Sequence, residues 1–173
     1  MTTTRIVVMG VSGCGKSTVG KLLAEYLGAR FIDGDDLHPR ANKEKMSTGT
    51  PLNDEDRWPW LDLVGEALTG APNPVDVFEV VKPTGTVVAC SALKRSYRQR
   101  ILDAAPGTTF IHLHGSPELL ASRMKSREGH FMKETMLASQ LETLEMLDTG
   151  EPGKVYDISL AAEEIVRRVL IAN

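Results

Sequence analysis

The chain has 173 residues, of which 42% are hydrophobic and 25% are charged, so it is long enough for one domain with a real core. Its formal net charge of −3 at pH 7 argues against a general nucleic-acid binder. Two cysteines without a CxxC spacing argue against a zinc site, and the apolar run 6–9 is too short for a signal peptide or a membrane span. We therefore expect a single cytoplasmic domain, residues 1–173.

Short β-branched runs alternate with helical patterns along the chain, which is typical of βα units around a parallel sheet. Strands are predicted at 6–9, 31–32, 86–90, 109–113 and 155–158. Helices are predicted at 19–27, from about Asp54, from Pro117 and over 161–170. This order of elements predicts an α/β fold with helices on the faces of a parallel sheet.

Two segments fit the alternation poorly. Residues 38–68 are polar at first and then helical, and residues 123–133 are highly charged and contain Gly129. We expect both to leave the core and to cover a substrate, the first as a helical excursion and the second as a mobile lid. The span 70–85, which contains three prolines, is expected to be a surface connection.

The stretch GVSGCGKST satisfies the pattern G-x-x-x-x-G-K-[ST] between a predicted strand and a predicted helix. Its glycines let successive N–H groups turn toward phosphate oxygens, and the first turn of the helix adds further donors. We expect Lys16 to bridge the β- and γ-phosphates and the Ser17 hydroxyl to bind Mg²⁺. A glycine-rich turn with a chance lysine is the alternative. The residues expected to bind the nucleotide are Gly10, Val11, Ser12, Gly13, Cys14, Gly15, Lys16, Ser17 and Thr18.

Other motifs narrow the kind of P-loop protein. NKEK from Asn42 lacks the aspartate of the guanine-recognition motif, which argues against a GTPase. The segment TVVACSALK ends its predicted strand near Ser91, so the usual acidic residue of a Walker B strand is missing. Mg²⁺ must then be bound from another part of the chain.

The stretch FIDGDDLHP follows the second predicted strand and is the candidate for this role. Ligands of open α/β sheets collect at the carboxyl ends of the strands. Asp33 could therefore reach the metal, directly or through its waters, and Asp35 could face an acceptor hydroxyl and take its proton. A solvated acidic turn is the alternative.

Together with GVSGCGKST, the stretches FIDGDDLHPRANKEKMSTGTPLNDEDRWPWL, CSALKRSYR, SRMKSREGHFM and SQLETLE make the chain resemble the gluconate kinases over nearly its whole length. These are P-loop sugar-acid kinases related to shikimate and nucleoside-monophosphate kinases. The resemblance implies a five-stranded parallel core with a mobile lid, and a homodimer. It implies transfer of a phosphoryl group from ATP·Mg²⁺ to the 6-hydroxyl of D-gluconate, with Asp33 in the metal shell and Asp35 orienting or deprotonating the acceptor. The connection 70–85 is longer than is usual in this family.

A linear sugar acid needs a cation for its carboxylate. Arg57 is the first candidate, with an ion pair to Asp54 as the alternative, and Lys94 lies just after the third strand. His38, which Pro39 restricts to an extended backbone, and His130 in the lid are further candidates for substrate binding, each against a structural role.

Arg123 and Arg127 are four residues apart, so they are expected to share one helix face and to close on the nucleotide phosphates. A solvated basic helix face is the alternative. The base pocket is expected from loops near 123–127 and 150–155. Further side chains are expected to be structural or at the surface: Trp58 and Trp60 packing a helix onto the core, Arg95 and Arg98 at a helix surface, His112 and His114 in either role.

Three rival functions stay open at this point. One is a kinase of the same fold that acts on another small acid or polyol, such as shikimate. Another is a nucleotide-binding regulatory protein that turns ATP over slowly without an acceptor. A nucleic-acid remodelling ATPase is disfavoured by the net charge and by the lack of a second domain.

Overall fold

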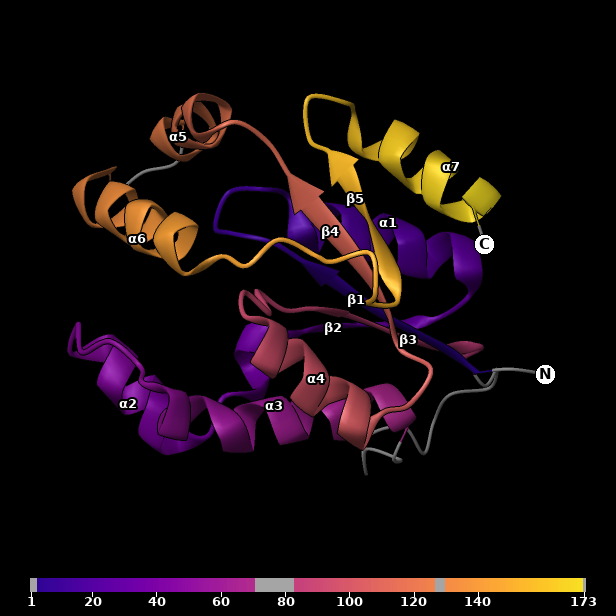
Figure 1. Cartoon of the computed structure of the whole chain (residues 1–173), viewed down its shortest axis with the longest axis horizontal. Coiled ribbons are helices and arrows are strands. Elements are labelled where there is room, and N and C mark those ends of the chain that lie inside the picture. The colour runs from indigo at the N-terminus through magenta and orange to yellow at the C-terminus, as the bar shows by residue number, and fades with distance from the viewer. Residues whose placement is uncertain (1–2, 71–82, 127–129, 173) are drawn as a thin grey trace.

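The computed structural model describes residues 3–70, 83–126 and 130–172, the side chains of 130–134 excepted. Five parallel strands form one sheet in the order β2-β3-β1-β4-β5, with helices on both faces (Figure 1). The strands are β1 Thr4–Met9, β2 Arg30–Asp33, β3 Gly85–Ala89, β4 Thr109–His114 and β5 Gly153–Asp157. The helices are α1 Lys16–Leu27, η1 Gly34–Leu37, α2 Arg40–Ser47, α3 Asp54–Thr69, α4 Arg95–Ala104, α5 Pro117–Lys125, α6 His130–Thr143 and α7 Ala162–Ala172.

The predicted α/β architecture is confirmed, and the strand ends differ from the prediction by at most two residues. Strand β1 lies in the middle of the sheet and pairs with β3 and β4. Its residues Val7, Val8 and Met9 have no exposed surface, which explains the continuous apolar run of a strand that is covered on both faces. Because all five strands are parallel, the loops that follow them meet at one edge of the sheet.

Two apolar clusters hold the helices on the sheet. One contains side chains of α1, α5, α6 and α7, including Leu23, Leu120 and Ile165. The other packs α3 and α4 against the opposite face, and there Trp60 is buried with Trp58 partly buried beside it. The predicted packing role of both tryptophans is therefore confirmed.

Helix α3 has a well-defined start. The Asn53 side chain accepts a hydrogen bond from the Asp56 N–H at 2.8 Å, and the Asp56 carboxylate accepts one from the Asn53 N–H at 3.0 Å. This capping box satisfies two N–H groups that the first turn would otherwise leave without a partner. It also fixes where the side chains of the first turn, including Asp54 and Arg57, leave the helix.

Arg98 corrects a prediction, because its side chain is fully buried rather than at the helix surface. It donates to both carboxylate oxygens of Glu151, at 2.6 and 2.9 Å, and to the carbonyl oxygens of Ala92, Leu93 and Glu145. The burial of a charge is tolerated here because every partner is an acceptor. Arg98 thereby ties the loop after β3 to the loop after α6.

His112 is also fully buried, on β4, in accordance with a structural role. Among the residues that the structure describes, neither of its ring nitrogens has a hydrogen-bond partner. Its ring lies 5.5 Å from that of His114 on the same face of the strand.

The described helices include none with the length and apolarity needed to cross a membrane. Most of the connection predicted at 70–85 lies outside the described residues.

Candidate active site

The phosphate loop, residues 10–18, joins β1 to α1. Gly10 has φ 142°, and a Cβ atom there would lie 2.6 Å from the carbonyl oxygen of Leu113, so only glycine fits. The N-cap of α1 is Gly15, which has no side chain to occupy the N–H groups of the first turn. These donors and the positive end of the helix dipole therefore remain available to an anion. The buried Cys14 side chain supports the loop, and burial raises the pKa of its thiol.

Lys16 turns back over the loop. Its Nζ atom donates a hydrogen bond of 3.1 Å to the carbonyl oxygen of Val11. On the other side of the same peptide group, the Ser12 N–H donates a hydrogen bond of 2.7 Å to Oε1 of Gln140 in α6. The ammonium group thus lies over the concave side of the loop, where the sequence predicts the phosphates.

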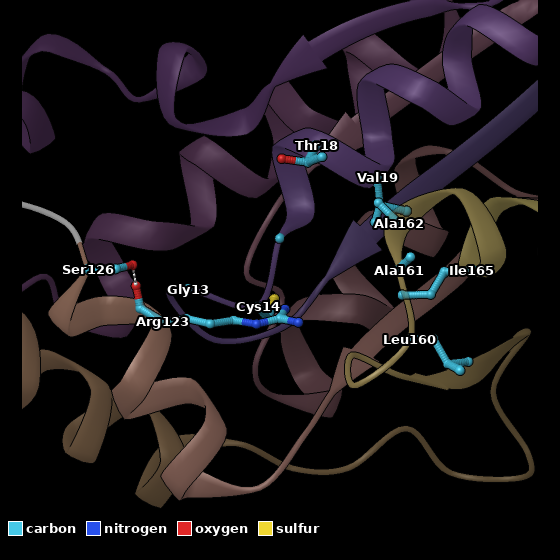
Figure 2. Close-up of a pocket in the computed structure, with 11 residues that line it drawn as sticks. Gly13, Cys14, Thr18, Val19, Arg123, Ser126, Leu160, Ala161, Ala162 and Ile165 are labelled. Carbon is cyan, nitrogen blue, oxygen red and sulfur yellow. Dashed lines mark hydrogen bonds between the residues drawn. The ribbon is translucent and has the colours of Figure 1, made fainter.

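A cavity of about 290 Å³ opens beside the phosphate loop (Figure 2). Its loop side is formed by Gly13, Cys14 and Gly15. The opposite walls come from α5 and from the loop that leads from β5 into α7. They are lined by Arg123, Ser126, Leu160, Ala161, Ala162 and Ile165.

Residues 150–155, from which part of the base pocket is expected, do not line this cavity, and the position of the base pocket stays a prediction. Residues 153–155 belong to β5 and pair with Phe110, Ile111 and His112 of β4. They lie toward the amino end of that strand, at the opposite edge from the phosphate loop. One wall of the cavity comes from the residues that follow β5, and another contains Arg123 and Ser126 from the span 123–127.

Arg123 extends its side chain across this cavity (Figure 2). One of its guanidinium nitrogens, Nη2, donates a hydrogen bond to the carbonyl oxygen of Ile158. Arg127 lies outside the described residues, and His130 begins α6 with a side chain that is likewise not described. The arginine clamp of the lid and the substrate contact of His130 stay predictions.

Asp33 lies at the end of β2 and reaches the phosphate loop. Ser17 Oγ donates a hydrogen bond of 3.3 Å to one carboxylate oxygen of Asp33, and the Asp35 N–H donates one of 3.0 Å to the other. Gly34 permits this turn, because a Cβ atom there would lie 2.5 Å from the carbonyl oxygen of Ala89. A hydroxyl and a carboxylate side by side are hard oxygen donors of the kind that Mg²⁺ takes, so the residues fit this ion.

Asp35 follows Asp33 and is open to solvent on one side. The protein around it still removes part of its water, and this desolvation raises the pKa of its carboxyl group, as does the negative charge of Asp33. The positive charge of Lys16 acts in the opposite direction. A carboxylate with a raised pKa beside a phosphate loop is a better proton acceptor than an ordinary aspartate.

The two predicted cations for a substrate carboxylate, Arg57 and Lys94, meet at Asp54. Lys94 Nζ lies 3.2 Å from each carboxylate oxygen of Asp54, and the Tyr97 hydroxyl donates to the same group at 2.5 Å. Arg57 Nη1 lies 3.9 Å from Asp54 and donates at 2.7 Å to the carbonyl oxygen of Leu52. The ion pair weighed as an alternative for Arg57 is therefore present, at the long end of the range, and both cations are about two-thirds covered.

His38 packs into the wall of the same region. Its ring stacks on Trp60 with 4.1 Å between the ring centroids, and its Nδ1 lies 3.3 Å from the side-chain nitrogen of Asn42. Burial, aided by the charges of Arg57 and Lys43, lowers the pKa of His38 to about 4. The imidazole is therefore neutral at pH 7.

The site is divided by β1. The candidate acceptor residues follow β2 and β3 on one side of this strand, while the cavity lies on the side of β4, β5 and α7, and the phosphate loop joins the two (Figure 1). Three residues of this arrangement, Asp54 as a bridge, Tyr97 and Gln140, are not predicted from the sequence. Tyr97 leaves a signal, because it follows Lys94 by three residues, and the sequence indicates Asp54 only as an ion-pair partner of Arg57, three residues away.

The fold and the site define a P-loop kinase of small molecules. The phosphate loop takes a nucleotide, and the carboxylates after β2, two strands away in the sheet, reach this loop through the Ser17–Asp33 hydrogen bond. The profile of the family described as "Shikimate kinase" matches residues 12–148, which is consistent with this class.

Similar individual proteins indicate the family within this class. The thermoresistant gluconokinase of Escherichia coli (strain K12) is 43% identical over 166 residues, covering 92% of this chain and 87% of that protein. A gluconokinase of Gluconobacter oxydans (strain 621H) is 49% identical over 147 residues, covering 85% and 78%. The crystal structure of a gluconokinase from Sinorhizobium meliloti 1021 matches with a TM-score of 0.82 and 48% identity over 98% of this chain and 90% of that chain. The chain belongs to the gluconokinase family.

Proposed function

We propose that this protein transfers the γ-phosphoryl group of ATP to the 6-hydroxyl of D-gluconate, giving 6-phospho-D-gluconate and ADP. The observation that carries the proposal is the turn after β2, where Asp33 contacts Ser17 of the phosphate loop and Asp35 follows two residues later with a raised pKa. The identity to gluconokinases over most of the chain supports the choice of substrate.

Magnesium-bound ATP supplies the phosphoryl group and an electrophilic γ-phosphorus. Lys16 and the N–H groups of the phosphate loop hold its phosphates, with Ser17 and Asp33 as the residues that would hold Mg²⁺. Asp35 accepts the proton of the 6-hydroxyl while the hydroxyl oxygen forms its bond to phosphorus and the bond to the β–γ bridging oxygen breaks. Arg123 adds positive charge where negative charge develops.

Gluconate is a linear acid, so its carboxylate and its 6-hydroxyl are bound by different parts of the site. Arg57 and Lys94 are the proposed partners of the carboxylate, because both carry positive charge and lie on the acceptor side of β1, Arg57 in the first turn of α3 and Lys94 just before α4. His38 is proposed as a neutral hydrogen-bonding group for a hydroxyl, which its low pKa allows. Arg127 and His130 are proposed to complete the nucleotide and acceptor contacts from the lid.

We further propose a homodimer that works in the cytoplasm on small molecules, and not on nucleic acid or membranes. The proposal includes one domain over 1–173, in which 38–68 forms the acceptor side and 123–133 forms the lid. The resemblance to the family supports these points, and the net charge of −3 is consistent with a small-molecule substrate.

The test is release of ADP from ATP·Mg²⁺ with no acceptor, D-gluconate, shikimate, glycerate or a nucleoside monophosphate. We expect strong stimulation by gluconate alone, and phosphorus NMR of the product should show one phosphate ester at the terminal hydroxyl. Stimulation by shikimate or another acceptor would overturn the substrate but keep the kinase. Slow turnover that no acceptor stimulates would favour the regulatory nucleotide-binding alternative.

A further inference from the structure

One peptide group of the phosphate loop is held from two sides. The carbonyl oxygen of Val11 accepts from Lys16 Nζ at 3.1 Å, and the N–H of Ser12 donates to Gln140 Oε1 at 2.7 Å. Because the C=O and N–H of a trans peptide point in opposite directions, these contacts fix the plane of the peptide between them. Lys16 is part of the loop itself, whereas Gln140 lies 128 residues after Ser12 in the chain.

Gln140 is well placed to act as a fixed acceptor. Its neighbours on α6, Leu137 and Leu141, pack into the apolar cluster around α1 and α5. Just after the helix, the Glu145 N–H donates at 2.8 Å to the carbonyl oxygen of Leu93, and the Glu145 carboxylate accepts from the Arg95 N–H at 2.6 Å. The helix that carries Gln140 is therefore anchored on both sides of this residue.

The loop on the other side of the contact is intrinsically free to move. Gly10 and Gly13 flank the Val11–Ser12 peptide, and both have positive φ. Glycines impose little resistance to rotation of a neighbouring peptide. Without an acceptor for the Ser12 N–H, this peptide can rotate and carry the Val11 carbonyl away from the Lys16 ammonium.

We propose that Gln140 is a positioning residue for phosphoryl transfer, which acts through the Val11–Ser12 peptide on the direction of the Lys16 ammonium group. The proposal rests on the proposed kinase function. The ammonium group donates to the Val11 carbonyl oxygen at 3.1 Å and makes a long contact of 4.0 Å with Cys14 Sγ, so the Val11 carbonyl is its stronger partner and sets its direction. A change in this orientation should affect the transition state more than the binding of the acceptor, because the proposed partners of Lys16 are the phosphates and not the sugar acid.

The test compares Gln140→Met with Gln140→Glu. Methionine has a similar length and fits apolar packing but lacks the oxygen acceptor, whereas glutamate keeps an oxygen at the same position. We expect Gln140→Met to lower kcat about tenfold with the KM for gluconate unchanged, as the loss of one positioning hydrogen bond implies. At saturating ATP, Gln140→Glu should stay within about threefold of the wild type. Gln99→Met on the exposed side of α4 is the matched control, with no expected effect.

A second readout does not depend on turnover. Amide hydrogen exchange of Ser12, followed by NMR on the whole protein without nucleotide, should be faster in Gln140→Met and close to wild type in Gln140→Glu. If no acceptor supports turnover at all, the proposed function fails, and this exchange pattern still tests the contact. Unchanged kcat and unchanged exchange in Gln140→Met would overturn the proposal. Equal loss of activity in both variants would also overturn it, since it would indicate packing and not the acceptor.

Discussion

Lys94 donates to both carboxylate oxygens of Asp54, each at 3.2 Å, and so joins the first turn of α3 to the start of α4. With Arg57 nearby, the three charges sum to one positive charge. Such a cluster can bind one carboxylate without leaving an unpaired cation. The pKa of Asp54 is held low by the hydrogen bonds from Tyr97 and Lys94, so the cluster keeps this charge at neutral pH.

Replacing Lys94 by methionine tests the role of this cluster. We expect Lys94→Met to raise the KM for gluconate about tenfold or more and to leave the KM for ATP unchanged, since one charge-assisted hydrogen bond to the acid is lost. Steady-state kinetics with each substrate varied in turn measures both constants. Lys154→Met, at an exposed position of β5, is the control. An increase in the KM for ATP alone would place Lys94 on the nucleotide.

Asp35 and Asp33 predict a pH dependence of the reaction. A carboxylate that accepts a proton must be ionised, so kcat/KM falls as the pH drops through the pKa of Asp35. That pKa is raised above the ordinary 3.8 by desolvation and by Asp33, so the acid limb lies at higher pH than for an ordinary aspartate. Asp33→Asn removes one cause of the shift and should move the acid limb to lower pH, besides weakening the dependence on Mg²⁺.

Asp35→Asn is the companion variant. We expect kcat to fall by about 10²- to 10⁴-fold with little change in the KM for ATP, as the loss of a general base implies. Asp36→Asn, at the exposed neighbouring position, is the matched control. A fall of only a few-fold in Asp35→Asn would show that this residue orients the hydroxyl without taking its proton.

The buried pair of Arg98 and Glu151 predicts a loss of stability. Glu151→Gln should lower the free energy of unfolding by about 3–5 kcal/mol, because it leaves a buried guanidinium without a counter-charge. Burial alone would raise the pKa of Glu151, but hydrogen bonds from Arg98 and from the Asp148 N–H outweigh it and lower this pKa. The contribution of the pair is therefore present at neutral pH and is lost as the pH falls through the lowered pKa.

Urea unfolding at pH 7 measures this loss. Glu118→Gln in the exposed first turn of α5 is the control and should change the free energy of unfolding by much less. A value for Glu151→Gln that is no larger than that of the control would contradict the importance of the pair.

The buried neutral His112 predicts that the stability of the fold decreases already between pH 6.5 and pH 4. Burial, and then the charges of His114 and Arg98, lower its pKa from 6.5 to about 4. Above pH 6.5 the imidazole is neutral in both the folded and the unfolded chain, and the contribution to stability is complete. As the pH falls from 6.5 toward 4, the unfolded chain binds a proton that the folded chain does not, so this stability is lost. The loss is on the order of 3 kcal/mol. Thermal unfolding between pH 7 and 4.5 measures this effect. In His112→Leu the unfolding temperature should depend less steeply on pH, and the remaining slope should come from His38. A slope equal to that of the wild type would contradict the buried neutral state of His112.

The sequence carries most of the information on the phosphate loop and on the turn after β2. Both depend on local patterns, namely glycine spacing next to a buried strand and carboxylates at a strand end. The burial of Arg98 could not be predicted, because its partner Glu151 is 53 residues away and its other partners are carbonyl oxygens of loops. The lining of the cavity by residues 160–165 is not predicted for a similar reason, since the position of these residues depends on the register of β5 against β4.

The division of the site by β1 has a consequence for how such enzymes diversify. In the proposed function, the elements on one side of this strand would meet the acceptor and those on the other side, around the cavity, would meet the base. Mutations after β2 and β3 can therefore alter the choice of acceptor while the handling of ATP is preserved. A single scaffold can in this way give rise to kinases for different acids, which fits the match of this chain to a profile named after another substrate.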